Sequence, residues 1–165
     1  MGKKKPFKIR FGEKWFGKFA ETLMFDPAGY EYLRWVQKSF SRNPTSERFL
    51  SRVEQLLAIG EKPLITATCS CGKPAELIAC VRRVDGVAFH DRCCQLCKED
   101  TFGEEFIPLK FSSIRRFRGA TDQKSFLQQL RQVVGLKYRE RLTVQKAFEI
   151  FFPPKPEPPK QHQLL

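Results

Sequence analysis

The chain has 165 residues, a formal net charge of +12 and 41% hydrophobic residues. A chain of this length and composition can bury a hydrophobic core, so the composition argues against an intrinsically disordered protein. No run of about 20 apolar residues occurs and no apolar signal-peptide core follows the basic N-terminus, so we expect a cytoplasmic protein without a membrane partner.

The positive charge lies on either side of a neutral middle segment. Residues 1–60 carry 12 Lys and Arg against 6 acidic residues, residues 61–100 carry 6 against 6, and residues 101–165 carry 12 against 6. Basic surfaces bind phosphate backbones because binding releases counterions. We therefore predict nucleic acid, either DNA or RNA, as a partner; a basic surface that serves only solubility is the alternative.

The first third of the chain predicts a small strand-turn-helix module. Residues 7–19 alternate apolar and basic side chains around two glycines, which favours two short strands joined by a turn. Asp26 and Pro27 predict a helix start, because Asp caps helices and Pro fits their first turn. A second helix is expected to begin within residues 43–45 and to end at Gly60.

The middle of the chain predicts strands, and the last part predicts helices. Asp85 and Gly86 form a typical hairpin turn. Thr121 or Asp122 is expected to cap one helix, and a last helix is expected over residues 142–152. Short strands are predicted over residues 64–69, 76–84, 87–90 and 105–111.

These elements predict the α+β class: a small mixed domain with short antiparallel strands, several helices and an inserted zinc-ribbon-like module. The predicted organisation begins with a basic flexible tail (1–6), which is followed by the strand-turn-helix module (7–60) and the zinc-ribbon-like module (61–100). A strand followed by helices (101–152) and a disordered Pro-rich tail (153–165) complete the chain.

Two closely spaced cysteine pairs predict a metal site. In a reducing compartment, bunched cysteines indicate metal binding rather than disulfides. Tetrahedral Zn²⁺ takes four thiolates, so we predict one structural Zn²⁺ held by Cys69, Cys71, Cys94 and Cys97. Residues 64–100 thus resemble a four-cysteine zinc ribbon, in which the ion stabilises a hairpin too small to form its own core.

Three other side chains compete with this ligand set. His90 or Cys93 can replace one of the four ligands, whereas Cys80 lies in an apolar strand and is expected to be a core residue. A group of unrelated buried thiols is the alternative to a metal site. A catalytic deaminase-type site is not favoured, because Asp91 and Arg92 follow His90 where that motif needs a glutamate.

The N-terminal segment carries a second resemblance. Residues 7–40 resemble the C-terminal module of exonuclease-X-like DNA exonucleases, with Phe11-Gly12, Gly17-Lys18, Asp26-Pro27 and Tyr32-Leu33-Arg34-Trp35 as the matching stretches. The resemblance implies an accessory module that accompanies DNA- or RNA-handling activities. It carries over no catalytic residue, because the carboxylate-bearing nuclease domain of that family is not present in this chain.

Basic residues beside aromatic ones are the candidate nucleic-acid contacts. Trp15 is expected to be exposed and to stack on a base, because its neighbours Glu13 and Lys14 are charged. The alternatives are aromatic residues that form a core and charges that only face solvent. The candidate residues are Lys14, Trp15, Lys18, Arg82, Arg83, Arg115, Arg116, Arg118, Lys137, Arg139 and Arg141.

Motifs typical of catalysis are lacking in this sequence. It has no nucleophile elbow, no phosphate-binding glycine loop and no carboxylates at metal-ligand spacing, so we expect no enzyme. We predict a non-catalytic, zinc-containing nucleic-acid-binding protein that serves, with other protein subunits, in a nucleoprotein complex of replication, mobile-element or CRISPR-type defence. The alternative is a zinc-stabilised adaptor whose positive charge binds an acidic protein.

The last five residues, Gln161-His162-Gln163-Leu164-Leu165, resemble the short peptides with which replication proteins bind a sliding clamp. They follow a Pro-rich arm that offers them no core to join. The resemblance implies docking to such a clamp; a plain disordered end is the alternative.

Overall fold

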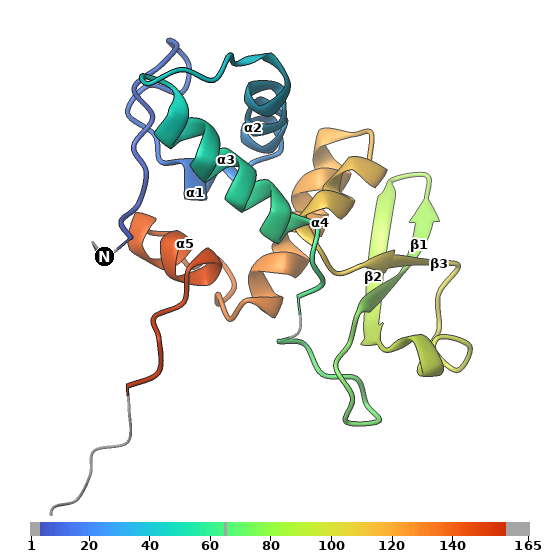
Figure 1. The fold of residues 1–165 in the computed structure, drawn as a ribbon. Helices are drawn as coiled ribbons and strands as arrows, with labels where there is room; N and C mark the ends of the chain where they lie inside the picture. Colours follow the sequence, from blue (N-terminus) through green and yellow to red (C-terminus); the bar gives the residue numbers. More distant parts are fainter. Residues whose placement is uncertain (1–3, 65, 158–165) are drawn as a thin grey trace, which may run out of the picture.

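The computed structural model describes residues 4–64 and 66–157 (Figure 1). Helices and one antiparallel sheet occupy different ends of the molecule, and helix α4 lies between them. This arrangement confirms the predicted α+β class. The clamp-like segment 161–165 lies outside the described residues.

The N-terminal part is built from helices α1 (Ala20–Leu23), α2 (Pro27–Ser39) and α3 (Glu47–Gly60). Asp26 caps α2 as predicted, because its Oδ1 accepts a hydrogen bond of 2.8 Å from the amide of Gly29. Helix α3 begins later than predicted. The side chain of Asn43 accepts from the amides of Thr45 and Ser46, which forms a turn before the helix.

The two strands predicted over residues 7–19 are absent from this described segment. The structure has one antiparallel bridge there, between Lys8 and Phe19. Gly12 and Gly17 have φ values of +71° and +79°, so the chain coils rather than extends. Phe7 and Phe11 each stack on Phe49 of α3 with ring centroids 5.5 Å apart, so the segment packs on a helix instead of forming a sheet.

The sheet consists of β1 (Leu77–Arg83), β2 (Gly86–Cys93) and β3 (Glu105–Pro108) in the order β2-β1-β3, with both pairs antiparallel. Three of the predicted strands are therefore confirmed. Strand β3 is shorter than predicted, because the 3-10 helix η2 (Phe111–Arg116) begins soon after it. The hairpin turn lies one residue earlier than predicted, since Arg83 pairs with Gly86.

The strand predicted over residues 64–69 is wrong for the positions that the structure describes. The segment contributes a single bridge, between Thr68 and Pro74. The chain turns back at once, and the amide of Cys69 donates to the carbonyl of Lys73 at 2.8 Å. This turn places the first cysteine pair in a loop before β1.

Helices α4 (Ala120–Val133) and α5 (Val144–Phe151) complete the fold. Helix α4 buries Phe126, Leu127 and Leu130 in the core. The predicted cap at Thr121 or Asp122 is wrong, because Gly119 precedes the helix and no side chain caps it. Asp122 instead accepts a hydrogen bond of 3.0 Å from the amide of Val87 and so attaches the hairpin to α4.

One hydrophobic core connects all these elements. It runs from Ile9 through β1 to Phe151. Phe111 lies between Phe25 and Phe151, with ring centroids 5.1 Å from each. The predicted modules therefore share a core. Among the described helices, none is long and apolar enough to cross a membrane.

Replacing Asp122 with Ala is expected to destabilise the protein by about 1–2 kcal/mol, because the amide of Val87 loses its acceptor. Urea unfolding measures this change in the free energy of unfolding. Asp122→Asn is the control, since its carbonyl oxygen can still accept and stability should largely return. An Ala variant as stable as the unmodified protein would show that this bond does not hold the hairpin on α4.

Candidate functional site

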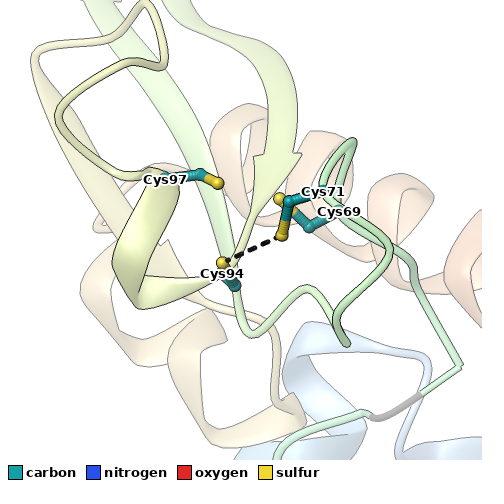
Figure 2. Close-up of side chains that lie close together, drawn as sticks. All are labelled: Cys69, Cys71, Cys94 and Cys97. Carbon is teal, nitrogen blue, oxygen red and sulfur yellow. Dashed lines mark hydrogen bonds between the residues drawn. The ribbon is translucent and has the colours of Figure 1, made fainter.

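The four predicted metal ligands converge on one point. The sulfur atoms of Cys69, Cys71, Cys94 and Cys97 all lie within 4.8 Å of one another (Figure 2). The sulfurs of Cys71 and Cys94 are 3.7 Å apart. A tetrahedral ion with Zn–S bonds of about 2.3 Å requires sulfurs about 3.8 Å apart. The cluster therefore has the size of a four-thiolate metal site.

Strand pairing brings the two cysteine loops together. The first pair lies in the loop before β1, and the second pair follows the end of β2 in the 3-10 helix η1 (Gln95–Cys97). Because β1 and β2 are antiparallel and Leu77 pairs with Cys93, the start of β1 lies beside the end of β2. Gly72, with a φ of +85°, permits the tight turn after Cys71.

Backbone amides favour thiolate at two of the sulfurs. Hydrogen bonds from the amides of Cys71 and Cys94 lower the pKa of Cys69 to about 6. The amides of Cys97 and Leu96 lower the pKa of Cys94. Hydrogen bonds with the side chains of Cys71, Cys69 and Cys94 raise the pKa of Cys97 to about 12. A divalent metal ion bound by all four sulfurs would supply the positive charge that four thiolates this close together need.

The rival ligands lie outside the four-sulfur group. Cys80 is fully buried in β1, and burial raises its pKa to about 11, as suits the predicted core residue. Burial also raises the pKa of Cys93. His90 packs edge-on against Phe102 with ring centroids 4.9 Å apart and lines an open, polar cavity of about 770 Å³. Among the residues that the structure describes, the group that can hold a metal ion therefore consists of the four predicted cysteines.

Two basic clusters that are distant in the sequence meet at one surface. The Arg82 Nε atom lies 2.7 Å from Glu105 Oε2, and its guanidinium is 5.7 Å from the ring centroid of the buried Phe117. Arg82, and more weakly Arg116, lower the pKa of the Glu105 carboxyl. The hairpin of β1 and β2 therefore lies beside the segment that carries Arg115, Arg116 and Arg118.

This surface continues onto α2. Arg115 Nε lies 3.5 Å from Glu31 Oε1, and Arg34 Nη1 lies 3.2 Å from Glu31 Oε2. Arg34 thus lies beside the predicted basic residue Arg115. We call the set that these contacts connect the arginine surface; its members are Arg34, Arg82, Arg115 and Arg116. Arg83 follows Arg82 directly in β1, so its side chain points to the other face of the strand, and Arg118 is exposed two residues after Arg116.

The N-terminal loop presents different aromatic residues from those predicted. Lys14 and Lys18 are exposed, but Trp15 is half-buried against Tyr32, with ring centroids 5.8 Å apart. The expected exposure of Trp15 is therefore wrong. The exposed aromatic side chains in this region are Phe16 and Trp35, at 64% and 53% of their full surface.

The helical spacing of the apolar residues in α2 indicates that Trp35 is not part of the buried face. The buried stripe of α2 consists of Gly29, Tyr30, Leu33 and Val36. Trp35 falls outside this stripe, on the same side of the helix as Glu31 and Arg34. An aromatic residue beside charged residues on the solvent face of a helix indicates a binding surface more directly than Trp15 does.

The remaining predicted cluster, Lys137, Arg139 and Arg141, lies between α4 and α5. All three side chains are exposed, and the Arg139 guanidinium lies 5.2 Å from the ring centroid of Tyr138. No ion pair or aromatic contact of the described residues joins this cluster to the arginine surface. Helix α4 separates the two, and its length at 1.5 Å per residue is about 20 Å.

No family model, curated protein or solved structure matches this chain. The resemblances of residues 7–40 to the exonuclease-X-like module and of residues 64–100 to a zinc ribbon stay predictions. The function is therefore inferred from the arrangement of the side chains.

Proposed function

We propose that this protein is a non-catalytic, zinc-containing nucleic-acid-binding protein that serves as an accessory subunit of a DNA- or RNA-processing complex. One observation carries the proposal: Arg82 and Arg116 lie near Glu105, and Arg115 of the same segment pairs with Glu31 of α2. The sequence suggested that these basic clusters share one binding face, with solvated surface charge as the alternative. Their convergence makes a face with several phosphate-binding groups within reach of one nucleic-acid strand.

Arginine side chains suit this role because the guanidinium group binds phosphate oxygens in a bidentate manner. The ion pair between Arg82 and Glu105 does not prevent it. Both side chains are partly exposed, and such surface pairs contribute about 0–1 kcal/mol. Arg82 can therefore exchange its carboxylate partner for a phosphate at little cost in free energy.

The metal has a structural role in this proposal. Four thiolates complete the tetrahedral coordination of Zn²⁺ and leave no position for a substrate or an activated water. Thiolate ligands in this arrangement favour Zn²⁺ over harder divalent ions such as Mg²⁺ and Ca²⁺. The ion would join the loop before β1 to the loop after β2, and Arg82 and Arg83 lie at the opposite end of β1.

The test is the salt dependence of binding. Zinc-loaded protein is titrated into a fluorescently labelled 20-nucleotide single strand of mixed sequence at several salt concentrations. We expect the logarithm of the association constant to fall linearly with the logarithm of salt, with a slope of about −3 to −4, which corresponds to about five neutralised phosphates.

Polyglutamate of the same length is the matched competitor, because it carries a similar charge without bases or phosphates. It should displace the oligonucleotide only at a large excess. Equal competition by polyglutamate would favour the adaptor that binds an acidic protein. No binding of the oligonucleotide at low salt would contradict the proposal outright.

A further inference from the structure

An unusual tryptophan lies at the edge of the arginine surface. Trp35 leaves about half of its surface exposed, although burial of a tryptophan is strongly favourable. Its ring stacks on Tyr32 at a centroid distance of 5.9 Å and packs edge-on against Phe40 at 5.6 Å. The side chain is therefore held in place by its neighbours and still presents a large apolar surface to water.

Trp35 belongs to a row of three rings. Trp15 packs against Tyr32, and Tyr32 stacks on Trp35, so the row runs from the N-terminal loop across α2. We call Trp15, Tyr32 and Trp35 the aromatic platform. Phe40 connects the platform to the core, because it packs against Trp35 and also against Phe49, with the Phe40 and Phe49 ring centroids 5.8 Å apart.

Cations outnumber acidic groups around the platform, where Lys14, Arg34 and Lys38 lie with the exposed Glu13 and Glu31, and this balance favours an anionic occupant. Lys14 Nζ lies 4.9 Å from the ring centroid of Trp15. Arg34 precedes Trp35 directly, and the exposed Lys38 follows it at i+3, on the neighbouring turn of α2. Glu31 connects Arg34 to Arg115, so the platform and the arginine surface form one continuous face.

We infer that the aromatic platform stacks with unpaired nucleobases, so that the protein prefers single-stranded over double-stranded nucleic acid. The inference rests on the proposed function. In a duplex, neighbouring base pairs cover the base faces, whereas a single strand offers them to an exposed aromatic ring. Phosphates bind the arginine surface, and a base of the same strand stacks on Trp35.

The experiment measures the affinities of the zinc-loaded full chain for a 20-nucleotide single strand and for the duplex of the same sequence, at one salt concentration. Trp35→Ala is expected to weaken single-strand binding about tenfold, which is the effect of losing one stacked base, and to change duplex binding less than about twofold. Trp35→Phe should restore most of the affinity, because a phenyl ring still stacks. The single strand should also quench the tryptophan emission of the unmodified protein.

Phe102→Ala is the matched control, since it also removes an exposed aromatic ring, but from the loop between η1 and β3. It should leave both affinities unchanged. Equal affinity of the unmodified protein for single strand and duplex, or an equal loss of both in Trp35→Ala, would overturn the inference and leave the proposed function intact. Absence of binding to either nucleic acid would contradict the proposed function as well.

Discussion

Replacing Cys94 with Ser is expected to reduce the zinc content from about one ion per chain to nearly zero after dialysis against a mild chelator. Cys94 is buried, and its sulfur lies 3.7 Å from that of Cys71 at the centre of the cluster. Serine replaces a soft thiolate with a hydroxyl that binds Zn²⁺ poorly. Structural Zn²⁺ contributes about 10–16 kcal/mol in small zinc-finger peptides, so this is the largest effect that we expect.

The loss of metal should unfold the cysteine loops more than the sheet. Leu77 and Ile78 of β1 belong to the main core, which holds the strand independently of the ion. Hydrogen exchange should therefore increase around residues 66–76 and 94–104, while β1 stays protected.

Cys80→Ala and Cys93→Ala are the matched controls for metal binding, since each removes a buried thiol outside the four-sulfur group. Both variants should retain about one Zn²⁺. If Cys94→Ser kept a full complement of zinc, or if Cys93→Ala lost it, the assigned ligand set would be wrong.

Replacing Arg115, Arg116 and Arg118 with Ala is expected to make the slope of log affinity against log salt shallower by about 2, because three phosphate contacts of a single strand are lost. The substitutions should leave the fold intact, because all three side chains are exposed and the buried Phe117 between them stays in place. Fluorescence anisotropy at several salt concentrations measures the slope.

The triple variant of Lys137, Arg139 and Arg141 tests whether position matters. It removes the same formal charge from the far end of α4, and its side chains are also exposed. We expect a clearly smaller change in slope than at residues 115–118. Equal changes would mean that net charge alone drives binding, and the arginine surface would lose its special role.

The sequence correctly predicted which four cysteines lie together, because residue type and spacing carry that information directly. Two short cysteine pairs can reach one ion from many backbone geometries, so Cys69 and Cys97 were identifiable although the strand proposed before Cys69 does not form. The cap of α2 was equally local, since Asp26 and Pro27 act within one turn of the helix.

Long-range pairing limited the rest of the prediction. The residues around Asp122 in the sequence do not show that its carboxylate accepts a hydrogen bond from the amide of Val87 instead of capping its own helix. The same applies to Arg115, whose approach to Glu31 depends on how η2 packs against α3 and α4. The exposure of Trp15 was predicted wrongly from its charged neighbours in the sequence. Tyr32 of α2 packs against the ring, and the residues next to Trp15 in the sequence do not indicate that contact.

Arginines from separate segments are proposed to form one nucleic-acid-binding face, and an NMR titration of zinc-loaded protein with an unlabelled single strand can follow both the amides and the arginine side chains. Resonances of residues 82–83 and 115–118 and of the exposed side of α2 are expected to shift together with one affinity. Shifts confined to residues 137–141 or to α5, or separate affinities for the hairpin and the 115–118 segment, would contradict this proposal.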